Sequence, residues 1–315
     1  MSHPHPTRTM RVSEKTEIAD RVVQLTLTPA DAEPLPRWEP GAHIDLILPN
    51  GITRQYSLCG RPSEREWRVA VLRELDGRGG SEHIHAALER GATIEIAGPR
   101  NHFSLEDAEE YLFIGGGIGI TPLLPMIDQV ARAGKPWRLV YGGRSRASMP
   151  YLQELSEQHP AHIDAWPQDE RGIIDLDAVL GDAPHGRAVY SCGPEPMLAA
   201  ITQHCEDWPD EAVHMERFAP IAVTDTADES FEVEIANSGK VYDIPADRSI
   251  LEVLRDGGEE VDWSCEEGTC GTCEVRILDG VAEHRDSVLT TAEQESQETM
   301  MICVSRARCR LKIDL

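Results

Sequence analysis

Four cysteines near the end of the chain limit its fold more than any other feature. Cys265, Cys270 and Cys273 share one short loop with the spacing C-x4-C-x2-C, and Cys303 follows after 29 intervening residues. This is the plant-type spacing for a [2Fe–2S] cluster. Three thiolates on one loop can surround two irons only where the backbone is flexible, and glycines stand between these cysteines. The spacing therefore predicts a cluster whose fourth ligand, Cys303, comes from a different strand.

Two other readings of the cysteines remain open. A structural zinc site usually pairs C-x2-C with a second such pair or with histidines, and the sequence shows neither arrangement. Cys309 is a rival fourth ligand, although its place in a final alternating strand favours a small buried side chain. The other cysteines are scattered, so the chain does not resemble a disulfide framework.

Length and charge restrict the kind of protein. A chain of 315 residues is long enough for two or three domains. Its formal charge of −25 argues against nucleic acid as a partner, because phosphates repel such a surface. No stretch reaches the roughly 20 apolar residues that a membrane helix needs. The first thirty residues lack the apolar core of a secretion signal, so we expect a cytoplasmic protein without a membrane contact.

The pattern of apolar and polar residues changes twice along the chain. Residues 1–104 contain alternating strand patterns and one helix from Ser81 to Gly91, which predicts a small antiparallel β-barrel. Residues 105–222 alternate buried strands with helices, which predicts a parallel sheet covered on both faces. Residues 223–315 hold the cysteine loop within an α+β pattern. A linker is expected at Ala219–Ser230.

The most specific nucleotide signal lies in the second segment. The run Gly115-Gly-Gly-Ile-Gly-Ile-Thr-Pro122 follows the predicted strand Tyr111–Ile114 and opens a helix. Glycines let a pyrophosphate approach the backbone, and a helix N-terminus offers unpaired N–H groups. Pro122 replaces the third glycine of the usual fingerprint, and no acidic residue follows about twenty positions on.

The barrel segment carries two further candidate sites. In Arg54-Gln-Tyr-Ser-Leu58, the arginine can hold a phosphate, the tyrosine can cover a ring and the serine can bond a ring nitrogen. The run Gly77-Arg-Gly-Gly-Ser81 precedes a helix and can form a second phosphate cradle. An ordinary strand and an ordinary turn are the alternatives for these two runs.

Taken together, these motifs resemble the phthalate dioxygenase reductase family, which includes the reductases of vanillate-type O-demethylases. The resemblance extends over nearly the whole chain and includes Gly98–Phe103 at the barrel exit, Tyr141–Arg146 near the adenosine end and Glu216-x-Phe218 as a closing motif. It implies cofactor-binding roles for Arg54, Gln55, Tyr56, Ser57, Gly79, Gly80, Ser81, Gly116, Gly117, Gly119, Thr121, Arg144, Cys192, Gly193, Pro194 and Phe218.

The resemblance also implies a fold and an activity. The fold is a flavin-binding barrel, an NAD(P)-binding α/β domain and a C-terminal β-grasp ferredoxin domain. The activity is an NADH-dependent reductase that passes electrons through FMN and a [2Fe–2S] cluster to a Rieske-type oxygenase. The protein positions and tunes these cofactors, so no catalytic acid or base is expected.

Four points stay open at this stage. An FAD-type electron-transfer subunit has the same parts, although its cluster loop is usually shorter before the last cysteine. A redox sensor without turnover is a second alternative. NADPH could replace NADH, because Arg144 and Arg146 could attract a 2′-phosphate. The acidic residues 226–315 could steer the domain onto a basic partner or merely keep the protein soluble.

Overall fold

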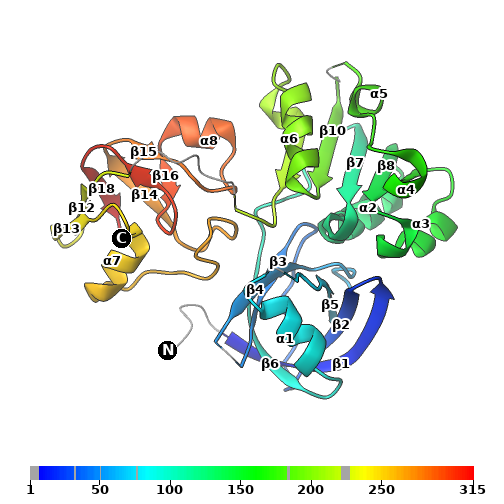
Figure 1. Ribbon diagram of the computed structural model, residues 1–315, viewed down its shortest axis with the longest axis horizontal. Coiled ribbons are helices and arrows are strands. Elements are labelled where there is room, and N and C mark those ends of the chain that lie inside the picture. The colour runs from blue at the N-terminus through cyan, green and yellow to red at the C-terminus, as the bar shows by residue number, and fades with distance from the viewer. Residues whose placement is uncertain (1–6, 32, 50, 76, 183–184, 221–227) are drawn as a thin grey trace. The chain divides into compact units, whose positions relative to one another are not determined.

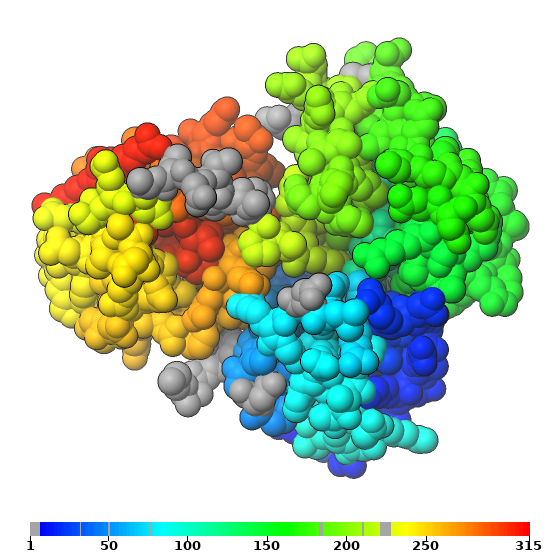
Figure 2. Space-filling model, viewed as in Figure 1, coloured from blue at the N-terminus to red at the C-terminus, as the bar shows by residue number. Residues whose placement is uncertain are grey.

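The computed structural model describes residues 7–31, 33–49, 51–75, 77–182, 185–220 and 228–315 (Figure 1). Within these ranges the chain forms two compact units, the first ending at Glu216 and the second beginning at Arg217. Side chains fill the spaces that the ribbon leaves between the elements of each unit (Figure 2). The boundary expected near residue 222 lies outside the described residues, and the division at residue 104 stays a prediction.

The first half of the first unit is an antiparallel sheet of six strands in the order β4-β3-β6-β1-β2-β5. Its edge strands β4 and β5 also approach each other, so the sheet curves into a barrel. The elements are β1 (Thr7–Ala19), β2 (Val22–Pro29), β3 (His43–Ile47), β4 (Thr53–Ser57), β5 (Trp67–Leu72), α1 (Gly80–Ala87) and β6 (Thr93–Arg100).

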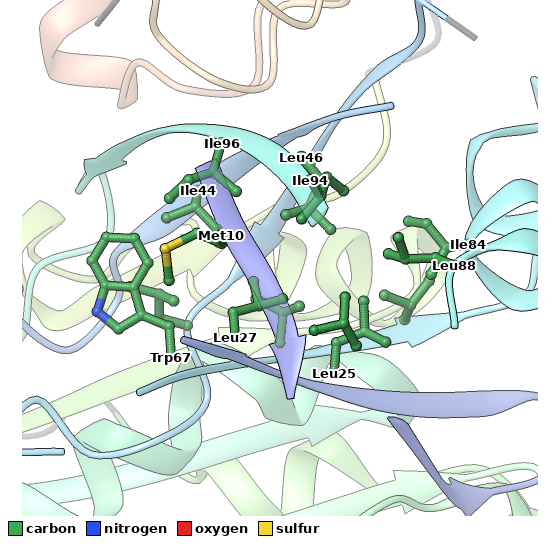
Figure 3. Close-up of a cluster of buried hydrophobic side chains, with 14 of the residues drawn as sticks. Met10, Leu25, Leu27, Ile44, Leu46, Trp67, Ile84, Leu88, Ile94 and Ile96 are labelled. Carbon is green, nitrogen blue, oxygen red and sulfur yellow. The ribbon is translucent and has the colours of Figure 1, made fainter. Parts of the chain in front are cut away.

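Alternation along these strands builds the barrel core. Leu25 and Leu27 of β2 and Ile44 and Leu46 of β3 point inward and are fully buried (Figure 3). Ile84 of α1 packs against the same core. Because α1 is anchored by this contact, its N-terminal glycines are held at a fixed place on the barrel.

The rest of the first unit is a parallel five-stranded sheet in the order β11-β10-β7-β8-β9. Its elements are β7 (Glu110–Gly116), η1 (Gly117–Gly119), α2 (Ile120–Arg132), β8 (Trp137–Gly143), η2 (Arg146–Ser148), α3 (Leu152–Gln158), β9 (Ile163–Pro167), α4 (Gln168–Arg171), α5 (Leu176–Leu180), β10 (Arg187–Cys192), α6 (Glu195–His204), η3 (Asp210–Ala212) and β11 (Val213–Glu216).

Helices cover both faces of this sheet, as its continuous apolar strands require. Phe113 and Tyr141 pack on one side with α2 and α3. Leu112 and Val140, their neighbours in sequence, pack on the other side with α5 and α6. Parallel strands end at a common edge, so the loops after β7, β8, β9 and β10 all emerge there.

The second unit has a mixed sheet in the order β13-β12-β18-β14-β16, in which β12 and β18 pair in parallel. Its elements are β12 (Phe231–Ile235), β13 (Val241–Ile244), α7 (Ile250–Asp256), β14 (Glu274–Asp279), β15 (Ala282–Glu283), α8 (Thr291–Ser296), β16 (Thr299–Met301), β17 (Arg306–Ala307) and β18 (Leu311–Asp314). Ser249 caps α7 with a reciprocal bond to Glu252. The expected barrel, parallel sheet and α+β ferredoxin domain are all confirmed. No helix in the described ranges is both long and apolar enough to cross a membrane.

A buried arginine holds the start of the second unit in place. The guanidinium of Arg306 donates to the carbonyls of Glu229 at 3.1 Å, Pro245 at 2.9 Å and Arg248 at 2.7 Å. Only 6 % of Arg306 is exposed, and its guanidinium also lies over the ring of Phe231. Two segments, one before β12 and one between β13 and α7, are therefore held by one guanidinium.

Replacing this donor should destabilise the unit. We expect Arg306→Met to lower the free energy of unfolding by about 2–4 kcal/mol, because it leaves carbonyls without a donor. The control Arg310→Met removes only exposed ion pairs to Glu232 and Glu234, so it should change stability by less than about 1 kcal/mol. Urea unfolding followed by circular dichroism measures both losses. Equal losses would contradict the role given to Arg306.

Candidate functional site

The four cysteines predicted as ligands lie together in the second unit. All four are buried, with between 1 % and 7 % of each residue exposed. Hydrogen bonds from Cys270 and then Cys303 lower the pKa of the Cys265 thiol far below its usual value. Contacts with Cys265 and then Cys273 raise the pKa of Cys303. The sulfur atoms therefore meet in one place, although Cys303 is distant in sequence.

The loop around these thiols suits a group with negative charge. The backbone N–H groups of Glu267 and Thr269 donate to the sulfur of Cys265 at 3.3 and 3.4 Å. Such bonds stabilise a thiolate and tune the potential of a bound cluster. Gly268 has a φ of 70°, and a Cβ there would lie 2.6 Å from a methyl group of Val304. The tight wrap predicted from the glycines is therefore a real steric requirement.

Within the described ranges, no three Cys, His, Asp or Glu side chains surround a single point as ligands of one metal ion would. What the structure does show is four buried cysteine thiols, with two backbone N–H groups donating to one of them. Four thiolates are the ligand set of a [2Fe–2S] cluster, so the residues present fit that group.

The expectation that Cys309 points into the core is wrong. Its side chain is exposed, and its sulfur lies 3.9 Å from the carbonyl of Val281. Strand β18 begins only at Leu311, and a bend at residues 308–309 separates it from β17. Because the bend interrupts the strand, the alternation that buries Leu311 and Ile313 does not extend to Cys309.

In the barrel, the two predicted phosphate sites converge on one point. Arg54 lies on β4, and Gly80 is the first residue of α1. A Cβ on Gly80 would lie 2.8 Å from Cγ and 3.1 Å from Nε of Arg54. Gly79 adopts a φ of 82°, and nothing lies within 4 Å of its missing Cβ. A guanidinium and a helix N-terminus thus flank an open glycine turn, which is a favourable place for a phosphate.

The other residues of these two motifs are already engaged in part. Ser81 Oγ accepts a hydrogen bond from the N–H of Glu74 at 3.0 Å, and its own proton can still be donated. Burial raises the pKa of Tyr56, which keeps it neutral. Gln55 donates to the buried Asp45 at 2.8 Å, and Arg100 donates to the same oxygen at 2.6 Å. Gln55 therefore stabilises the barrel by a hydrogen bond between β4 and β3.

Two glycine-rich loops meet where β7 and β10 end. A Cβ on Gly116 would lie 2.5 Å from Pro194, and one on Gly119 would lie 2.3 Å from the carbonyl oxygen of Cys192. The hydroxyl of Tyr141 lies 3.0 Å from the carbonyl of Gly117, which adopts a φ of 54°. The order in which successive strands are added to the sheet reverses between β7 and β10, and nucleotides bind at such a switch point.

The other residues predicted to bind the nucleotide do not all lie in the two loops after β7 and β10. Thr121 is buried, and its hydroxyl bonds the carbonyl of Ile118 at 3.0 Å, so it stabilises the turn. Gly193 packs against Gly116 in the loop pair described above. Arg144 is exposed after the end of β8. Phe218 lies beyond the first unit, with 46 % of its surface exposed.

One residue missing from the predicted set links the barrel to the nucleotide loops. Glu216 ends β11, directly beside Cys192 of β10. Its carboxylate lies 3.4 Å from the hydroxyl of Ser57, at the end of β4. Burial raises the pKa of Glu216 to about 8 and, with the nearby Glu216, also raises the pKa of Cys192. The motif Glu216-x-Phe218 contained the signal for this residue, but only Phe218 was predicted from it to bind a cofactor.

Comparisons with known proteins agree with this geometry. Residues 233–308 match the model of the 2Fe-2S iron-sulfur cluster binding domain, and residues 113–203 match that of the oxidoreductase NAD-binding domain. The chain is 42 % identical over 300 residues to the phenoxybenzoate dioxygenase subunit beta of Ectopseudomonas oleovorans, covering 94 % of each chain.

Two further relatives support the assignment. The crystal structure of an intact type IV self-sufficient cytochrome P450 monooxygenase is 42 % identical with a TM-score of 0.90, covering 98 % of this chain but only 41 % of that longer chain. Phthalate dioxygenase reductase of Burkholderia cepacia is 35 % identical over 319 residues, covering 97 % of both chains. With its motifs, its fold and this full-length similarity, the chain belongs to the phthalate dioxygenase reductase family.

Proposed function

We propose that this chain is an NADH-dependent reductase that passes electrons through FMN and a [2Fe–2S] cluster to a Rieske-type oxygenase component. The observation that carries the proposal is the approach of Ser57, Cys192 and Glu216 within one compact unit. It brings the barrel motif and the nucleotide loops to one place, so a nicotinamide and a flavin ring can meet there. We place the reaction in the cytoplasm, where the cluster thiols stay reduced.

Each residue has a specific task in this proposal. Arg54 and the backbone at Gly79 and Gly80 would hold the terminal phosphate of FMN. Ser57 would bind the flavin ring, and Gly117 and Gly119 would let the nicotinamide nucleotide approach the backbone. When bound, FMN supplies the ability to take two electrons together and release them singly, and the cluster carries one electron at a time.

The oxygenase acceptor is proposed from the relatives. Two carry names of dioxygenase systems, which fits a separate oxygenase component as the acceptor. A second candidate acceptor is a haem monooxygenase, because the similar P450 chain has a counterpart of this protein within one polypeptide. Rates of reduction of a purified Rieske oxygenase and of a P450 haem domain distinguish these acceptors. Reduction of the haem domain alone would favour the second.

The flavin site can be tested by its anion contacts. We expect Arg54→Gln to weaken FMN binding by about tenfold or more, because a charge-assisted contact to the phosphate is lost. Arg61→Gln removes an exposed pair with Asp128 at 3.0 Å and should leave FMN affinity unchanged. Fluorescence titration of the flavin-free protein measures both. Stoichiometric FAD released from the native protein would instead support the FAD-type alternative.

The ligand assignment gives a second test. Cys303→Ser should remove most cluster absorbance and stop electron delivery to cytochrome c, while NADH oxidation by ferricyanide continues from the flavin. Cys309→Ser should keep the cluster and both activities, because that side chain is exposed. Loss of the cluster in Cys309→Ser but not in Cys303→Ser would show the assignment to be wrong. Loss of ferricyanide reduction in a folded, flavin-replete Cys303→Ser would contradict the proposed order of electron flow.

Glu216 gives a test based on pH. Its pKa rises from an ordinary 4.5 to about 8 on folding, so the folded state holds a proton that the unfolded state releases. This contribution to stability is complete below pH 4.5 and disappears as the pH rises through 8. Between pH 5 and 8 the wild type should therefore lose at least about 1.4 kcal/mol relative to Glu216→Gln. Urea unfolding across this range measures the difference, and parallel pH profiles would contradict it.

A further inference from the structure

The second strand of the nucleotide-binding sheet lacks the residue that usually selects NADH. The strands β7 to β11 follow the order 3-2-1-4-5 along the sheet, which is the dinucleotide-binding order. In that arrangement an acidic residue after the second strand bonds the ribose 2′-hydroxyl, whereas an arginine accommodates a 2′-phosphate. Here β8 is the second strand, and the residues after it include Arg144 and Arg146 but no carboxylate.

A carboxylate reaches this place from the neighbouring strand instead. Glu170 lies in α4, directly after β9. Its two oxygens accept hydrogen bonds from Nε and Nη2 of Arg146 at 2.9 and 3.0 Å. This bidentate pair uses the N–H groups along one edge of the guanidinium, which could otherwise bind a phosphate. Both side chains are about half exposed, so a nucleotide can reach them.

The two loops that carry this pair are fixed to each other. The N–H of Asp169 donates to the carbonyl of Arg144 at 3.1 Å. A reciprocal cap between Ser145 and Ser148 shapes the turn that begins at Arg146. Because these bonds are made by backbone and short side chains, changing Glu170 leaves the position of Arg146 in place.

Two other arginines at this edge of the sheet, Arg171 and Arg144, differ from Arg146 in their partners. The guanidinium of Arg171 stacks on Trp166 at 3.6 Å and bonds Asp164 at 2.6 Å. Arg144 is exposed and has no ion-pair partner among the residues that the structure describes. Because Arg144 is unchanged in every variant compared below, it does not account for a change in preference caused by Glu170→Gln. Arg146, by contrast, is paired with Glu170, so its guanidinium is not available to a 2′-phosphate.

We propose that Glu170 selects NADH against NADPH by occupying Arg146 and presenting its own negative charge to a 2′-phosphate. The proposal rests on the proposed function, because it concerns the dinucleotide of that reaction. A 2′-phosphate carries nearly two negative charges. It would face the carboxylate of Glu170 and find Arg146 already paired, whereas a 2′-hydroxyl can donate to the same carboxylate.

A binding experiment tests this without the flavin reaction. Calorimetry compares 2′,5′-ADP, which carries the 2′-phosphate, with 5′-AMP, which does not, on the full chain. The wild type should not favour 2′,5′-ADP. In Glu170→Gln the affinity ratio should move toward 2′,5′-ADP by about tenfold, since a repelling charge is removed and Arg146 is released. The double variant Glu170→Gln/Arg146→Ala should lose most of that gain.

A control variant and kinetics complete the test. Glu157→Gln changes an exposed carboxylate on α3 that bonds Gln153, and it should leave the ratio unchanged. With ferricyanide as acceptor, Glu170→Gln should shift the kcat/KM ratio toward NADPH, mainly through the KM for NADPH. An unchanged ratio in both assays, or a wild type that favours the 2′-phosphate, overturns the inference even if NADH is oxidised. If the protein oxidises neither NADH nor NADPH, the proposed function is overturned. The binding ratios of 2′,5′-ADP and 5′-AMP then still decide the role of Glu170.

Discussion

The parallel pairing of β7 with β8 and β10 is the constraint on which the nucleotide site depends. Parallel strands end at one edge, so loops far apart in sequence emerge side by side. Their backbones can approach only where no Cβ intervenes, and Gly116 and Gly119 meet Pro194 and Cys192 at distances that a side chain would forbid. The same edge places Glu216 of β11 next to Cys192. One sheet therefore determines where a nicotinamide, a flavin ring and a buried carboxyl can meet.

The sequence allowed the fold class and most of the candidate site to be predicted, because both depend on local patterns. Cysteine spacing identifies the four buried thiols, and glycines before helix starts identify two cradles. Alternation and helical spacing separate the barrel from the α/β sheet. The strand β9 was not predicted, since Ile163–Pro167 is a half-buried edge strand without an apolar run.

The remaining errors and omissions have a common cause in tertiary structure. Cys309 is exposed because a bend interrupts the strand pattern, which the alternation of residue types does not reveal. Gln55 bonds Asp45, which lies opposite it on β3, so its role depends on strand register. The pairs Ser57 with Glu216 and Arg146 with Glu170 join residues from different strands and loops. Such contacts require knowledge of which elements are neighbours in space.

The hydrophobic cores have a consequence for how this protein can be combined with others. Among the described residues, the core of the second unit contains only residues from Phe231 onward, and the cores of the first unit contain none of them. A unit that buries its own core can be joined to a new neighbour without being redesigned. Gene fusion can thus join these units to a different electron-accepting domain, which agrees with the match of this chain to 41 % of a longer P450 chain.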